Sequence, residues 1–266
     1  MTASLGRMWA LALNTFREAA RSRILYGILV LVVGANLLSV TCGELSVHEQ
    51  DRVARDFSLA GISLLGSLTA IVLGVLLLYA EVQKRTVHAI VSKPIERWEF
   101  VVGKYLGMAL VLTLLVLLFT GAMMAQLASQ GVAINAAVAK AVVLAWMEVM
   151  TVAAIAVFFS SFSSPFLSGI FALALFAIGS VTPDLEFAVE KSHAAWIKIV
   201  AEGALQIVPD LHLFGISGRT IDGQAVSVNG DFVSWSYVGV ASAHGLLWIA
   251  GLLLFACVIF RRRDFV

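Results

Sequence analysis

The chain has 266 residues, of which 60% are hydrophobic and only 13% are charged, and its formal net charge is +1. Soluble domains carry about 25% charged residues, so a domain of this composition would lack the polar side chains that cover a surface in water. The apolar richness excludes a disordered chain. The small net charge argues against a nucleic-acid-binding protein, which needs a basic surplus. The composition predicts an integral membrane protein.

Residues 1–23 precede the first long apolar stretch, and their pattern predicts an amphipathic helix. Apolar side chains recur there every three or four residues, as at Leu5, Trp9 and Phe16, while Arg17 falls on the other side. We interpret this segment as an interfacial helix whose aromatic side chains lie at the acyl boundary. The alternative, a solvated leader, does not explain the apolar stripe.

Six stretches are long and apolar enough to cross a bilayer, whose hydrocarbon core of about 30 Å needs about 20 helical residues. They are Ile24–Val40, Ser58–Ala80, Val101–Ala128, Ala137–Ser160, Pro165–Val181 and Ser236–Phe260. A short turn separates the fourth from the fifth and ends at Pro165, because proline fits the first turn of a helix. The sequence therefore predicts an all-α integral membrane fold, with residues 1–266 in one transmembrane domain.

The basic residues are divided unequally between the two sides of the membrane. Six spans place both termini on the same side as the loop 81–100, and this side collects 12 of the 18 Lys and Arg residues. Lys and Arg are enriched in cytoplasmic segments. We therefore expect a multi-pass protein of a bacterial-type inner membrane, with both termini in the cytoplasm.

The loop 81–100 is the one internal cytoplasmic segment of any size between the predicted spans. Val82, Val87 and Ile90 could form one apolar face of a short helix, which ends near Ser92 because Pro94 disfavours helix just before it. The loop could merely anchor the second and third spans by its positive charge. Anchoring does not require apolar residues facing the cytoplasm, however, whereas a docking surface for a soluble partner does.

The largest segment on the outer side is 182–235. Its helical periodicity predicts one or two interfacial helices over residues 186–208. After Pro209, the pairs Asp222-Gly223 and Asn229-Gly230 flank a short alternating stretch, which predicts a small β-hairpin. This loop is too short for a catalytic domain, but its size suits a lid or a contact with a partner.

The chain lacks the sequence motifs of the common catalytic and nucleotide-binding sites. It contains no P-loop, no H-E-x-x-H and no G-x-S-x-G. Its five His residues show no metal-ligand spacing. We therefore predict no catalytic residue, no metal site and no cofactor bound by this chain.

Glu148 is the one ionisable residue deep in a predicted span. A charge at the centre of a bilayer costs at least about 2.5 kcal/mol, so such a residue marks a transport pathway or a specific partner by default. The alternative is a structural Glu148 that is protonated or hydrogen-bonded, with Thr151 one turn away as a candidate partner.

Small residues at helical spacing favour close contacts between membrane helices. Gly66, Ala70 and Gly74 line one face of the second span, and Gly103 and Gly107 form a G-x-x-x-G pair at the start of the third. We predict that these five residues serve helix packing.

Several segments together resemble the ABC-2 type transporter permeases, which are the membrane subunits of ABC transporters. Ala12–Leu25 resembles the interfacial elbow helix that leads into the first span in this family. Lys84–Thr86, Ser92–Arg97 and Gly103–Gly107 resemble the loop between spans two and three, with the start of span three. The C-terminal Arg261–Phe265 resembles the family's ending.

The resemblance implies a transport subunit that works with a separate ATPase, which would bind ATP and Mg²⁺. Two copies of the chain, or one copy and a homologue, would form a dimer around a transport path. The complex would be an exporter. The loop would dock on the ATPase as a coupling helix through Glu81, Lys84, Arg85, Thr86, Lys93, Pro94 and Arg97. The alternative is a membrane anchor or scaffold of a periplasmic maturation or assembly complex, with 182–235 as its contact surface.

Overall fold

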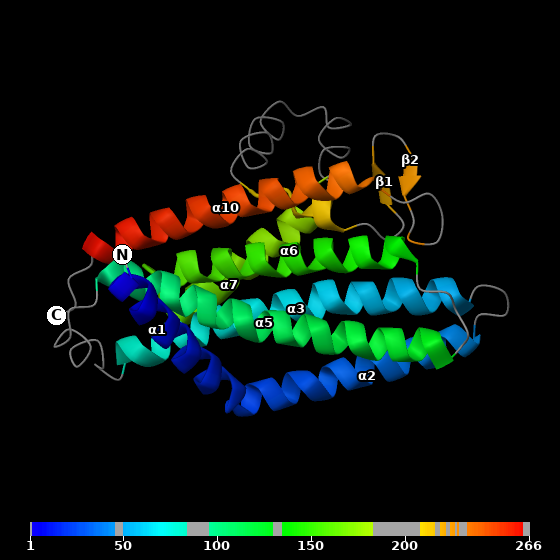
Figure 1. The fold of residues 1–266 in the computed structure, drawn as a ribbon, viewed down its shortest axis with the longest axis horizontal. Coiled ribbons are helices and arrows are strands. Elements are labelled where there is room, and N and C mark those ends of the chain that lie inside the picture. Colours follow the sequence, from blue (N-terminus) through cyan, green and yellow to red (C-terminus); the bar gives the residue numbers. More distant parts are fainter. Residues whose placement is uncertain are drawn as a thin grey trace.

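The computed structural model describes residues 2–45, 50–83, 96–129, 135–182, 208–215, 219–221, 224–226, 228 and 233–262. Most of these residues belong to an elongated helix bundle (Figure 1). Its long helices are α2 (Arg23–Leu45), α3 (Gln50–Gln83), α5 (Arg97–Ser129), α6 (Ala136–Ser160) and α10 (Trp235–Arg262). The shorter α7 (Pro165–Ser180) packs on α6 and α3, and α1 (Thr2–Ala20) lies obliquely across one end of the bundle.

Each of the six predicted apolar stretches lies on a helix of this bundle. Within the described residues, four helical segments are long and apolar enough to cross a membrane: 55–76, 97–129, 136–160 and 235–261. Two apolar helical segments, 26–39 and 165–180, are shorter. The predicted helical membrane architecture is thus present, and the number of six spans remains a prediction.

Helix α6 is the central element, in contact with α3, α5, α7 and α10. Every residue from Met147 to Val157 is buried. A helix that is apolar all round belongs in the interior of a bundle, and Ala153, Ala154 and Ala156 let neighbouring helices approach this one closely. The core of the protein therefore follows the length of α6.

The small residues of α3 lie against α6. A Cβ atom on Gly66 would come within 2.7 Å of Val149 Cγ2, and one on Gly74 within 2.6 Å of Ala156 Cβ. Ala70, which lies between them on the same face, is fully buried. These three positions bring the α3 backbone close to α6.

Gly103 and Gly107 of α5 have a different partner, the N-terminal helix α1. A Cβ atom on Gly103 would lie 2.9 Å from Leu11 Cβ, and one on Gly107 would lie 2.5 Å from both Ala12 O and Thr15 Cβ. Ala12 and Thr15 are buried in this contact, whereas Trp9 of the same helix is exposed. Helix α1 is therefore packed directly on the first turns of α5.

This contact predicts that Gly107→Leu lowers the free energy of unfolding by about 1–3 kcal/mol, the usual cost of overpacking. A side chain at this position would collide with the α1 backbone. The measurement is thermal unfolding of the purified protein in mild detergent. Gly121→Leu is the matched control, because a Cβ atom on Gly121, in the same helix, would meet nothing within 4 Å. Equal melting temperatures for the two variants would contradict the prediction.

The end of the bundle opposite α1 carries the predicted hairpin (Figure 1). Strands β1 (Arg219–Ile221) and β2 (Gln224–Val226) pair antiparallel, with Ile221 opposite Gln224. Two residues, 222 and 223, thus connect the strands, the commonest hairpin connection, and Asn229-Gly230 lies beyond the pair. The sequence pattern identified the hairpin but not its first strand. The interfacial helices predicted over 186–208 lie, apart from Val208, outside the described residues.

Candidate functional site

Glu148 lies midway along α6, and only 3% of this residue is exposed. Ser63 of α3 donates a hydrogen bond from its Oγ to Glu148 Oε2 over 2.7 Å. Thr151 was the partner of Glu148 that the sequence suggested, but its hydroxyl donates instead to the carbonyl oxygen of Met147 at 2.9 Å. Glu148 is therefore held by the neighbouring helix α3, across the face where the two helices pack.

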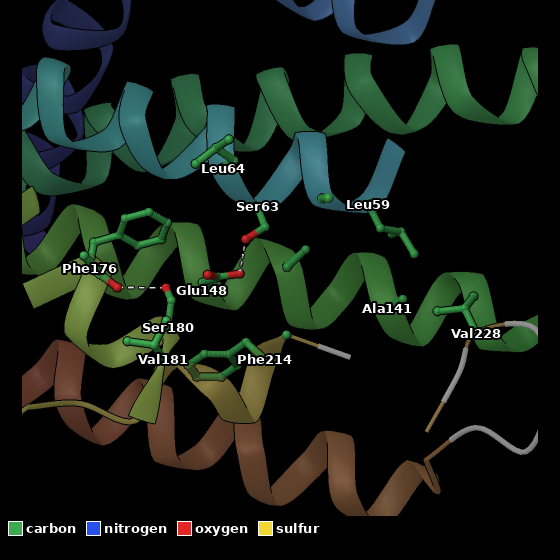
Figure 2. Close-up of a pocket in the computed structure, with 14 residues that line it drawn as sticks. Leu59, Ser63, Leu64, Ala141, Glu148, Phe176, Ser180, Val181, Phe214 and Val228 are labelled. Atoms are coloured by element: carbon green, nitrogen blue, oxygen red, sulfur yellow. Dashed lines mark hydrogen bonds between the residues drawn. The ribbon is translucent and has the colours of Figure 1, made fainter. Parts of the chain in front are cut away.

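Glu148 lines a cavity of about 400 Å³ between α3, α6, α7 and the segment after Pro209 (Figure 2). Leu64 of α3, which is 52% exposed, and Val181 after α7 both line this cavity and reach the protein surface. The cavity therefore opens at the flank of the bundle, between α3 and α7. The lining residues are Leu59, Ala60, Ser63, Leu64, Ala141, Ala145, Glu148, Phe176, Ala177, Ser180, Val181, Phe214, Gly215 and Val228.

Among the residues that the structure describes, three polar side chains line this cavity: Ser63, Glu148 and Ser180. Ser180 donates its hydroxyl hydrogen to the carbonyl oxygen of Phe176 at 2.7 Å. The other lining side chains are apolar, apart from Gly215, and Figure 2 shows the rings of Phe176 and Phe214 among them. A mostly apolar cavity with a few convergent polar groups is the usual form of a small-molecule site.

The short 3₁₀-helix η1 (Leu211–Phe214) contributes Phe214 to the cavity. Asp210 caps this helix by accepting from the His212 backbone N–H at 3.1 Å. The Tyr237 hydroxyl of α10 donates to Leu213 O at 2.9 Å. On the α7 side, a Cβ atom on Gly179 would lie 2.7 Å from Pro209 O, so glycine permits the close approach. The segment is thereby fixed between α7 and α10.

The other end of the bundle is joined by a partly buried ion pair between α1 and α5. Arg7 donates from Nε to Glu99 Oε2 at 2.9 Å and from Nη2 to Glu99 Oε1 at 2.6 Å. Glu99 is 1% exposed and also accepts the Glu96 backbone N–H at 3.3 Å. Lys104 adds a second ion pair one turn later, 3.4 Å from Glu18. One carboxylate thus caps the start of α5 and binds α1.

The same end brings the start of α5 against the end of α10. Arg97 donates from Nη1 to the carbonyl oxygen of Arg261 at 3.0 Å, a favourable place for a cation at a helix C-terminus. The rings of Phe100 and Phe260 stack with centroids 5.7 Å apart. A groove of about 760 Å³ lies beside this junction, lined by Glu96, Arg97, Trp98, Leu254, Cys257, Val258 and Arg261.

The predicted docking residues lie mostly between α3 and α5. Glu81 is on the last turn of α3, and Arg97 is the exposed first residue of α5. The others, Lys84, Arg85, Thr86, Lys93 and Pro94, lie outside the described residues. The structure therefore places the two ends of the predicted coupling loop at the end of the bundle where α1, α5 and α10 meet.

The chain matches one protein-family model, described as ABC-2 family transporter protein, over residues 9–265. The chain belongs to the ABC-2 transporter family. It is thus a multi-pass membrane permease, and the predicted family resemblance is confirmed. A search of curated proteins found no match to this chain.

Three features of this ABC-2 permease were not foreseen from its sequence. Ser63 is one of several serines in a span, and nothing in its spacing distinguishes it. Glu99 stands three residues after Glu96, and this spacing is typical of a capping interaction at the N-terminus of a helix, so the sequence could have indicated it. The pairing of Glu99 with Arg7, however, follows only from the fold. The short helix η1 had a weaker signal, the Pro209-Asp210 pair before Leu211.

Proposed function

We propose that this permease is the membrane-spanning subunit of an ATP-driven exporter, coupled to a separate ATPase through the loop 81–100. It would span the membrane six times with both termini in the cytoplasm. Two copies, or one copy and a homologue, would form the dimer. ATP and Mg²⁺ would bind in the ATPase, in keeping with the absence of a P-loop motif from this sequence.

The continuity of α3 is the observation that carries this proposal. A single helix, Gln50–Gln83, holds both Glu81 at the start of the predicted docking loop and Ser63 at the Glu148 cavity. At 1.5 Å per residue these positions are about 27 Å apart. A displacement imposed on the loop by an ATPase would therefore reach the Ser63–Glu148 hydrogen bond through one rigid element.

The contacts of α5 give the loop a second connection to the bundle. Its first turns are bound to α1 through Arg7–Glu99 and to α10 through Arg97–Arg261. A force applied at the end of the loop would thus move α1, α5 and α10 together. This arrangement suits a subunit that receives mechanical work from outside the membrane.

The proposal is tested by isolating the tagged permease in mild detergent from its own cells. We expect an ATPase subunit to co-isolate, identified by mass spectrometry as a P-loop protein and by ATP hydrolysis in the eluate. A permease that folds but brings no nucleotide-binding protein would overturn the proposal. Recovery of periplasmic proteins instead would favour the scaffold alternative.

Charge reversal in the docking loop should uncouple the two subunits. We expect the triple variant Lys84→Glu, Arg85→Glu, Arg97→Glu to lower the yield of co-isolated ATPase at least tenfold. Each substitution replaces a positive charge that would attract the ATPase surface by a negative charge that would repel it. The measurement is the ATPase-to-permease ratio after isolation. Arg52→Glu is the control, since Arg52 lies near the predicted outer side. An unchanged ratio in the triple variant would show that docking occurs elsewhere.

A further inference from the structure

The Glu148 cavity has a composition that points to one chemical class of ligand. Its described lining carries one acidic side chain and no basic one. The acid is 3% exposed and lies in the middle of a membrane-length helix. We propose that this cavity binds the cationic group of an amphipathic organic cation, an inference that rests on the transport function proposed above.

The first argument is electrostatic. A carboxylate held in a low-dielectric interior interacts far more strongly with an opposite charge than it would in water. Ser63 fixes the carboxylate by donating to Oε2, so the acid is oriented before the ligand arrives. A ligand cation beside Glu148 would therefore be attracted strongly to this carboxylate inside the membrane.

The second argument is the aromatic lining. Phe176 and Phe214 both line the cavity, from α7 and η1, and both are nearly fully buried. Aromatic rings attract cations through their π faces, most strongly where water is excluded. Two buried rings and one acid together favour an organic ammonium group over a hydrated metal ion, which requires several oxygen ligands.

The third argument is the shape of the opening. A volume of about 400 Å³ is near the lower end of ordinary ligand sites, roughly 300–1,000 Å³. Leu64 and Val181 are exposed apolar residues at the flank of the bundle. An apolar tail longer than the cavity could therefore extend past them along the side of the protein that faces lipid, while the charged group stays at Glu148.

The experiment measures equilibrium binding of tritiated decyltrimethylammonium to the permease in phosphatidylcholine nanodiscs, with binding to empty nanodiscs subtracted. We expect saturable binding to the wild type, weakened at least tenfold by Glu148→Gln, which keeps the size and hydrogen-bonding shape of the side chain. Thr151→Val is the matched control, because Thr151 is buried on the same helix but does not line the cavity. Binding should be unchanged in this variant.

A competitor separates charge recognition from simple partition into an apolar site. Unlabelled decanol has the same chain length without the charge, and we expect it not to displace the labelled cation. Equal displacement by decanol, or equal affinity in Glu148→Gln, would overturn the proposal. It would also be overturned by an absence of saturable binding to the wild type.

A second measurement keeps the proposal testable if Glu148→Gln does not fold. Dicyclohexylcarbodiimide modifies carboxyl groups in apolar surroundings, and the modified Glu148 peptide is quantified by mass spectrometry. We expect decyltrimethylammonium, but not decanol, to protect wild-type Glu148 at least fivefold. Without such protection the inference is wrong. Co-isolation of the ATPase is scored separately, so its presence without cation binding would refute this inference alone.

Discussion

Arg7→Gln is expected to lower the free energy of unfolding of the permease, because it leaves the buried Glu99 carboxylate without its cation. Removing one partner of an ion pair leaves the other charge uncompensated, and the cost is largest where the remaining charge is buried. The cost arises mainly at Glu99, because the Arg7 side chain is 35% exposed, against 1% for Glu99. The measurement is unfolding of the purified permease by denaturant in mild detergent micelles.

The double variant Arg7→Gln, Glu99→Gln provides the decisive comparison. Once the charge on Glu99 is removed as well, we expect the double variant to be more stable than Arg7→Gln alone, so that the two effects do not add. Arg17→Gln, at an exposed position on the same helix, is the control and should change stability by less than about 0.5 kcal/mol. Additive effects at Arg7 and Glu99 would show that the ion pair does not hold α1 to α5.

Glu148→Leu is expected to reduce ATP-driven transport at least tenfold, since it removes the one acid in the described lining of the cavity. The assay is ATP-dependent accumulation of tritiated decyltrimethylammonium in inside-out vesicles that contain the permease and its ATPase. Glu148→Gln should show a loss of similar size, because glutamine restores the shape of the side chain but not its charge.

The two substitutions at Glu148 distinguish a pathway role from a structural one. Normal transport in Glu148→Gln together with loss in Glu148→Leu would assign Glu148 to holding α3 against α6 through Ser63. Normal transport in both variants would remove Glu148 from the pathway. Thr151→Val accompanies both as the control for a buried polar change on α6.

The helices of this permease were largely predictable from the sequence, because apolar length is a property of each segment taken alone. The apolar stretch Ala137–Ser160 corresponds to α6 within a residue at its N-terminus, and Pro165 begins α7 as its position predicted. The fit is poorer where a helix extends past its apolar stretch. Helix α3 begins at Gln50, eight residues before the predicted span, because a helix can continue with polar side chains beyond the membrane.

The candidate site was only half predictable. Glu148 was identifiable by itself, since an acid in an apolar stretch of that length is conspicuous in any sequence. Its hydrogen-bond donor was not, because Ser63 lies 85 residues away and nothing local distinguishes it from other serines. The sequence offered Thr151 for proximity along the helix, but the Thr151 hydroxyl is directed to its own backbone, as is common for threonine in membrane helices.

By itself, the sequence determined that this chain is a membrane permease, which segments are helical and apolar, and that a basic loop lies between the second and third of them. Tertiary structure alone decided that Arg7 pairs with Glu99, which lies 92 residues away in the sequence, and that α1 packs against Gly107. It also decided that η1 contributes Phe214 to the Glu148 cavity. The physical reason is the same in each case. Partition into lipid depends on the composition of one segment, whereas a buried pair or a cavity depends on how several segments pack together.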